Sequence, residues 1–122
     1  MLSDTLMNIK TMFTKNQILT DSELLSLCDI LRVYRTGMWM YPGVIARKVP
    51  LTVKKTYAVT DLLALHGYIK PYYELYCSNC QHATGGIYET INEMPEEFEC
   101  ELCHATMTSI QNSILVFKVM AE

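Results

Sequence analysis

Two short cysteine motifs carry the residues of this chain that are best suited to chemistry. Cys77 and Cys80 lie in "CSNC", Cys100 and Cys103 lie in "CELC", and the full spacing is C-x2-C-x19-C-x2-C. Two residues between cysteines let the backbone turn so that both thiolates face one ion, and two such pairs complete a tetrahedron with bonds of about 2.3 Å. The spacing therefore predicts one structural Zn²⁺ held by four thiolates.

Three other chemistries use the same kind of residue. "CELCH" matches the haem c attachment pattern, but haem c requires export and leaves Cys77 and Cys80 without a role. A thioredoxin-like dithiol requires a cysteine pair at a helix N-terminus, whereas strand-like and acidic residues surround both pairs. Iron in a rubredoxin-like site would use the same four sulfurs, so metal analysis is needed to separate it from zinc.

Strand-like segments flank both motifs. "YYELY" precedes the first motif and "HATGGIY" follows it, while "EFE" precedes the second and "ATMTSI" follows it. This layout resembles a zinc ribbon, and "SILVFKVM" is expected to add a further strand to its small sheet. Zinc ribbons often have Gly after the second cysteine of each motif, where this chain has Gln81 and His104, so these residues must adopt a tight or left-handed backbone at modest cost. We expect His82 and His104 to lie beside the metal or face solvent rather than bind it.

The region before the first motif has helical periodicity. Helices are expected over residues 4–15, capped by Ser3 or Asp4, and over residues 21–34, capped by a box of Thr20 and Glu23. "RTGMWMYPG" indicates a turn or loop, followed by a short helix from Pro42 that stops before Pro50. Thr52 is expected to cap a helix over residues 53–66 that ends at Gly67, and residues 68–76 are expected to form a strand. The core stripes comprise Leu6, Ile9, Met12 and Phe13, then Leu24, Leu27, Cys28, Leu31 and Tyr34.

The order helix, turn, helix, strand is that of a winged helix. "TYAVTDLLALHGYI" resembles the recognition helix and wing strand of winged-helix proteins, which implies that Val59 and Leu63 face the core. The resemblance also implies that Lys54, Lys55, Ala58 and Leu65 point outward. We therefore expect an α+β fold with a winged-helix-like domain over residues 1–76 and a four-cysteine zinc ribbon with a C-terminal strand over residues 77–122. An unrelated helical bundle with a hairpin is the alternative.

Composition narrows the class of protein. The chain has 122 residues, of which 50% are hydrophobic and 19% charged, as in a folded globular protein. It shows no signal peptide and no run of about 18 apolar residues, so we expect a cytoplasmic protein without a membrane partner. Residues 1–70 contain nine Lys and Arg against five Asp and Glu, whereas residues 71–122 contain one Lys against eight Glu. A mildly basic first part is thus joined to a strongly acidic second part.

Motifs for catalysis are missing from the sequence. The five glycines form no phosphate loop, and neither a G-x-S-x-G nor an H-E-x-x-H motif occurs. We therefore expect neither enzymatic activity nor a small-molecule substrate. The glutamates of "NEMPEEFECE" form a solvated acidic face or a docking surface for a basic partner.

Two functions fit these residues. The first is an accessory or adaptor module for a protein partner, with Trp39, Leu65, Glu96 and Glu97 as contact residues, although Trp39 could instead cap the domain's own core. The second is binding of duplex DNA, with Arg47 and Lys48 on phosphates and with Thr52, Lys54, Lys55 and Ala58 in the major groove.

The acidic second part favours the adaptor function, since it would repel phosphate. The combined architecture resembles the N-terminal part of the large subunit of general transcription factor E and prokaryotic winged-helix proteins with a ribbon. Whether the chain forms a homo-oligomer is left open by the sequence.

Overall fold

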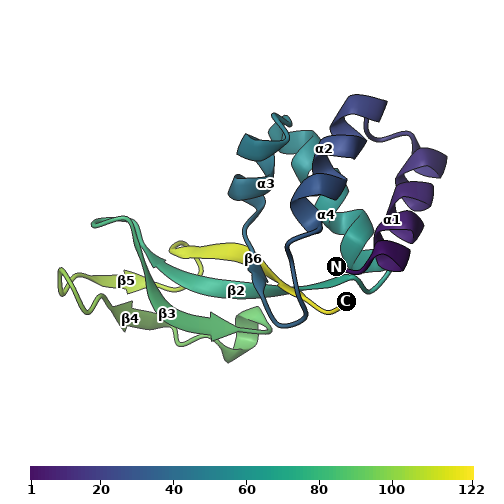
Figure 1. Ribbon diagram of the computed structural model, residues 1–122. Coiled ribbons are helices and arrows are strands. Elements are labelled where there is room, and N and C mark those ends of the chain that lie inside the picture. Colours follow the sequence, from purple (N-terminus) through teal and green to yellow (C-terminus); the bar gives the residue numbers. More distant parts are fainter. The chain divides into compact units, whose positions relative to one another are not determined.

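The computed structural model of the chain describes residues 1–84 and 86–122. These residues form an α+β fold, as predicted, with the four α-helices in the first part of the chain and all antiparallel strands except β1 after them (Figure 1). The helices are α1 (Ser3–Asn16), α2 (Asp21–Leu31), α3 (Pro42–Lys48), α4 (Val53–Leu65) and the short 3₁₀ helix η1 (Ile91–Glu93). The strands are β1 (Trp39–Met40), β2 (Ile69–Cys77), β3 (His82–Tyr88), β4 (Glu97–Glu99), β5 (Thr106–Thr108) and β6 (Ser113–Val119).

The described chain divides into two compact units. The first unit contains Met1–Lys70 and Phe117–Glu122, and the second contains Pro71–Val116. The first unit's chain is therefore interrupted by the second, because β2 leaves the first unit and β6 returns to it. Within the described residues, no helix has the length and apolar character needed to cross a bilayer.

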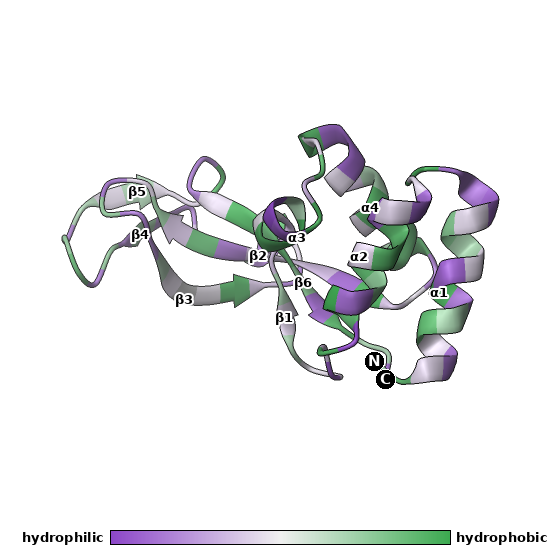
Figure 2. Cartoon of the chain, turned by 45° about the horizontal axis from the view of Figure 1, so that its top comes forward, coloured by the Kyte–Doolittle hydropathy of each residue, from purple (hydrophilic) through white to green (hydrophobic). Residues whose placement is uncertain are grey.

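Hydrophobic residues at helical spacing form the core of the first unit, as the sequence predicted. Figure 2 shows the corresponding alternation of hydrophobic (green) and hydrophilic (purple) residues along α1. The side chains that this spacing buries are Leu6, Ile9, Met12 and Phe13 of α1, Leu24, Leu27, Cys28 and Leu31 of α2, Tyr34, and Val59 and Leu63 of α4.

Local signals set most of the helix boundaries. The side chain of Thr20 accepts from the N–H of Glu23 and the side chain of Glu23 accepts from the N–H of Thr20, which confirms the capping box at the start of α2. Thr52 caps α4 by accepting from the Lys55 N–H at 3.1 Å. Gly67 follows α4 with φ +79°, a left-handed conformation that glycine adopts at little cost. The predicted cap of α1 is wrong: the helix begins at Ser3, and no side chain caps it.

The strands form two separate sheets. One has the order β1-β6-β2-β3, and the other is the β4-β5 hairpin. β1 lies where the sequence predicted a turn or loop, and it pairs with β6 through Trp39 opposite Lys118 and Met40 opposite Phe117. The C-terminal strand thus lies between β1 and β2 and does not extend the β4-β5 hairpin.

Candidate metal centre

Two similar turns bring the four cysteines together. Cys77 is the last residue of β2 and Cys80 lies in the turn before β3, while Cys100 follows β4 and Cys103 lies in the turn before β5. In each turn, the N–H of the residue after the second cysteine donates to the carbonyl of the first: Gln81 to Cys77 at 2.7 Å and His104 to Cys100 at 2.9 Å. Each motif therefore closes on itself in the same way.

The residues that replace glycine in these turns have the left-handed backbone that the sequence required. Gln81 has φ 59° and His104 has φ 60°. A side chain in this region crowds the backbone, which costs about 1 kcal/mol. In both turns this conformation accompanies the backbone hydrogen bond that closes the motif.

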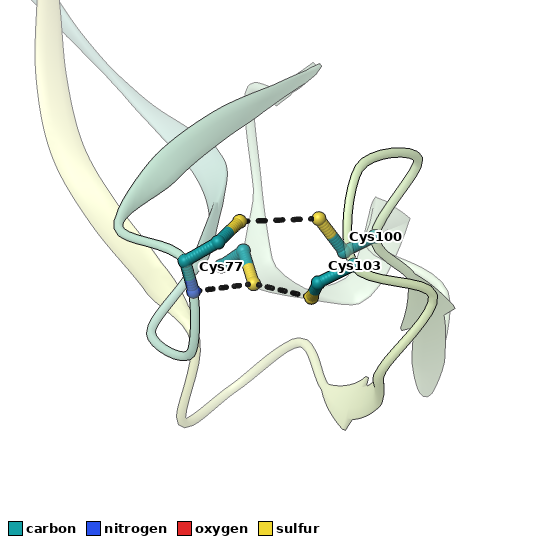
Figure 3. Close-up of side chains that lie close together, drawn as sticks. Cys77, Cys100 and Cys103 are labelled. Carbon is teal, nitrogen blue, oxygen red and sulfur yellow. Dashed lines mark hydrogen bonds between the residues drawn. The ribbon is translucent and has the colours of Figure 1, made fainter.

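The four sulfurs form one compact group. All four Sγ atoms lie within 4.8 Å of one another. Cys77 Sγ lies 3.5 Å from Cys103 Sγ, and Cys80 Sγ lies 3.5 Å from Cys100 Sγ. A dashed line in Figure 3 marks the contact between Cys77 and Cys103. Bonds of about 2.3 Å to a central tetrahedral ion would place sulfurs about 3.8 Å apart. The four cysteines are thus positioned to bind a metal ion, as the sequence predicted.

The four sulfurs affect one another's ionisation. Sulfurs at this spacing cannot all be ionised without a compensating positive charge. Its contacts with Cys77 and the other sulfurs, together with desolvation, raise the pKa of Cys80 to about 12. By contrast, a hydrogen bond from the Asn79 side chain and another from the Ala105 backbone lower the pKa of Cys103 to about 6. The Cys100 pKa is also lowered, mainly by the backbone N–H groups of Cys103 and Leu102.

The two histidines beside the motifs make contacts with oxygens. His82 Nδ1 lies 2.6 Å from the carbonyl oxygen of Cys80. His104 Nδ1 lies 3.1 Å from Glu99 Oε1, and both of these side chains are exposed. Neither histidine belongs to the metal-binding group among the described residues.

The remaining cysteine belongs to the first unit. Cys28 lies on the buried side of α2, and desolvation by burial raises the pKa of its thiol. It is therefore a core residue, as the sequence predicted.

The residues predicted to bind DNA differ in their exposure to solvent and in their contacts within the chain. Arg47, Lys48, Thr52 and Lys54 are exposed, and Ala58 is half-buried. Lys55 Nζ lies 2.9 Å from Glu23 Oε1, the oxygen that also accepts from the Thr20 N–H. The positive charge of Lys55 is therefore already paired within the first unit, a contact that the sequence did not predict.

The predicted partner residues occur on both units. Leu65 is 80% exposed at the end of α4, and Glu96 and Glu97 are exposed before and on β4. Trp39 is half-buried and lines a groove of ≈ 480 Å³ with Val33 and Met38, both of which are exposed. Trp39 thus both contributes to the β1-β6 pair and reaches the surface.

The β4-β5 hairpin has two chemically different faces, which the sequence analysis missed. Glu97 is opposite Thr108 and Glu99 is opposite Thr106, and all four side chains are exposed. Phe98 is opposite Met107 on the other face, and both are half-buried. The alternation of polar and apolar residues in "EFE" and "TMT" could have predicted these two faces from the sequence.

Comparison of this chain with protein families, with curated proteins and with solved structures finds no match.

Proposed function

We propose that this protein is a non-catalytic zinc-binding module that acts as an accessory or adaptor subunit through protein contacts in a larger complex. The donor set supports zinc, because four thiolates in a compact group are the typical ligands of a structural zinc site. When bound, the ion would hold the two cysteine turns together. Since four thiolates leave no coordination position for water or substrate, the site would stabilise the fold without performing a reaction.

A winged-helix arrangement of the first unit is part of this proposal. The order α3, turn, α4, β2 and the neighbouring positions of β1, β6 and β2 in one sheet support it. In that arrangement α4 would be the recognition helix. Whether the exposed side chains of α4 are apolar or basic therefore helps to decide between a protein partner and DNA.

The exposed side of α4 carries the adaptor proposal. Val53 is 71% exposed, Tyr57 47% and Leu65 80%. Positions 53, 57, 61 and 65 lie four residues apart and so share one side of the helix, where Asp61 is the acidic member. The exposed apolar side chains at three of these four positions favour burial against another protein over contact with phosphates.

Duplex DNA remains the second candidate because Arg47, Lys48 and Lys54 are exposed. Two features weigh against it. Lys55 is paired with Glu23, and residues 71–116 contain seven Glu without any Lys or Arg. Four thiolates around one Zn²⁺ would add further negative charge to that second unit and repel phosphate.

Binding to a fluorescent duplex at low salt separates the two candidates. The adaptor proposal expects no anisotropy change at micromolar protein. It is contradicted if the duplex binds, binding falls steeply as salt rises, and charge reversal of two exposed lysines in Lys48→Glu plus Lys54→Glu abolishes it. Lys10→Glu plus Lys15→Glu on α1 makes the same charge change away from α4 and serves as the control.

A second measurement tests the adaptor role itself. Once a co-purifying protein has been identified, its Kd should rise about tenfold or more with Leu65→Glu, because a buried apolar contact would gain an unpaired charge. Leu102→Glu introduces the same change at another exposed leucine, in the second unit, and should leave the Kd unchanged. Equal effects of both substitutions would contradict a role for α4.

A further inference from the structure

A groove of the first unit combines apolar walls with access from solvent. It is lined by the end of α2, by the segment that leads into β1 and by Lys48 of α3. Val33 is 68% exposed, Met38 is 42% exposed and Trp39 is half-buried. The volume of ≈ 480 Å³ lies within the range of about 300–1,000 Å³ that is typical of binding sites. The groove is therefore large enough and open enough to receive side chains of another molecule.

Hydrogen bonds hold one wall of this groove in place. The sulfur of Met38 accepts from the Arg35 N–H at 3.2 Å. The Gly37 N–H donates to the Val119 carbonyl and the Val119 N–H donates to the Met38 carbonyl, both at 2.8 Å. β1 follows directly and pairs with β6. Because this wall is ordered before anything binds, an occupant loses little free energy in ordering it.

The side chains of the groove are of the types that protein interfaces use. Trp and Tyr are enriched at the positions that contribute most to binding between proteins. Met is flexible and adapts its shape to different partners. Tyr34, Met38 and Trp39 line this groove together with Val33. This composition favours a protein segment with bulky apolar side chains as the occupant.

The charged side chains of the groove differ in whether they are paired. Asp29 Oδ1 lies 3.6 Å from Arg32 Nη1, so these two charges compensate each other. Lys48 is exposed and forms no ion pair with any residue in the ranges 1–84 and 86–122. The groove thus presents an unpaired positive charge beside its apolar walls. An acidic residue next to an apolar side chain complements this arrangement.

We propose that this groove binds a short segment of a protein partner in which bulky apolar side chains lie next to acidic residues. The apolar side chains pack against Val33, Met38 and Trp39, and a carboxylate pairs with Lys48. This inference rests on the proposed adaptor function and names the chemistry of one partner segment. It involves neither the cysteine group nor the exposed side of α4.

The fluorescence of Trp39 tests this assignment, because the chain contains one tryptophan. The full chain is titrated with the peptide acetyl-EELFEE-amide, which should change the emission saturably with a Kd below about 1 mM. The peptide acetyl-KKLFKK-amide keeps the apolar pair but reverses the charge and should bind at least about tenfold more weakly. The peptide acetyl-EEAAEE-amide lacks large apolar side chains and should cause no change.

Two pairs of variants place the peptide in the groove. Val33→Asp should weaken binding of the acidic peptide about tenfold or more. Leu25→Asp is the matched control, since Leu25 is 56% exposed on α2 and does not line this groove. Lys48→Glu should remove the preference for the acidic peptide over the basic one. Lys15→Glu makes the same change in net charge at an exposed position of α1 and should keep that preference.

Four outcomes would overturn the inference. In the first, acetyl-EELFEE-amide at about 1 mM changes neither the emission nor the indole N–H resonance of Trp39. In the second, the basic peptide binds as tightly as the acidic one. In the third, Val33→Asp and Leu25→Asp have equal effects, which places the peptide elsewhere. In the fourth, the chain is a dimer whose Trp39 emission changes on dilution without peptide, so that a second copy fills the groove.

Failure of the groove and failure of the adaptor function can be told apart. If the acidic peptide does not bind while Leu65→Glu still weakens binding of the identified partner, the adaptor function stands and the groove is not its site.

Discussion

Lys55 of α4 and Glu23 of α2 form an ion pair, with Nζ 2.9 Å from Oε1. The same carboxylate oxygen accepts from the Thr20 N–H and completes the capping box of α2. One acidic side chain therefore both starts a helix and links it to a second helix of the first unit. The side chain of Glu23 is 20% exposed and that of Lys55 is 39% exposed, so solvent partly screens the pair.

Substitutions at Glu23 should separate its two contacts. Glu23→Gln keeps an oxygen for the Thr20 N–H but removes the charge, so the free energy of unfolding should fall by up to about 1 kcal/mol. Glu23→Ala also removes the acceptor of the Thr20 N–H, while Thr20 still caps the helix, and should cost about 0.5–1 kcal/mol more. Urea unfolding of both variants measures these losses. No loss in Glu23→Gln would show that the ion pair contributes nothing, and equal losses in both variants would show that the hydrogen bond from Thr20 contributes nothing.

The contribution of this ion pair should depend on pH. The hydrogen bond from Lys55 and then that from the Thr20 backbone lower the Glu23 pKa from its usual 4.5. A lowered folded-state pKa means that the stabilisation is complete above the unfolded-state value and is lost as pH falls through the folded-state value. The stability gap between the wild type and Glu23→Gln should therefore be full at pH 7 and should shrink below about pH 4. A gap that stays constant down to about pH 2 would contradict this.

Removal of a metal ligand should affect the second unit most. In Cys100→Ser the zinc content should fall well below one ion per chain, because a buried thiolate is replaced by a poor ligand. Amide exchange at Phe98 and Met107, which are paired across the β4-β5 hairpin, should become fast. Metal analysis and exchange measurements check both results. Cys28→Ser should keep its zinc and its hairpin protection, and loss of zinc from that control would implicate a different ligand set.

Glycine in the cysteine turns should stabilise the metal-bound protein. Gln81→Gly relieves the left-handed strain at φ 59°, a gain that exceeds the added entropy of the unfolded chain by about 0.5 kcal/mol. Gln81→Ala keeps a Cβ in the strained conformation and should give no gain. Thermal unfolding of the zinc-loaded variants compares the two, and a higher melting temperature for alanine than for glycine would refute the strain argument.

Two leucines on α4 should respond very differently to truncation. Leu63 has 0% of its surface exposed, so Leu63→Ala should cost about 2–5 kcal/mol through lost burial and a cavity. Leu65 is 80% exposed, and Leu65→Ala should change the free energy of unfolding by no more than about 0.5 kcal/mol. Denaturant unfolding of both variants measures the contrast. A large loss with Leu65→Ala would mean that this residue packs within the chain and is not available to a partner.

Features encoded by neighbouring residues were predictable from the sequence. The capping oxygens of Thr20 and Thr52 act within three residues of their own position, and the positive φ of Gln81 and His104 follows from the tight spacing of each cysteine motif. The four-cysteine group was also predictable, because two identical turns of this kind can satisfy a metal only together.

Features that depend on residues far apart in the chain were not predictable from the sequence. The two-residue strand β1 exists because residues 39 and 40 pair with residues 118 and 117, far along the chain. Neither "WM" nor its glycine-rich and proline-containing surroundings indicates a strand. Likewise, Lys55 looked like an exposed cation until the fold placed Glu23 beside it.

The interruption of the first unit's chain by residues 71–116 has a consequence for evolution and for metal depletion. If this insert unfolds, the first unit has only to close a loop between Lys70 and Phe117. The entropy of loop closure grows with the logarithm of loop length, so each doubling costs only about 0.6 kcal/mol. The first unit can therefore stay folded after the metal is lost. Insertions or deletions within residues 71–116 would likewise change the free energy of unfolding of the first unit only slightly.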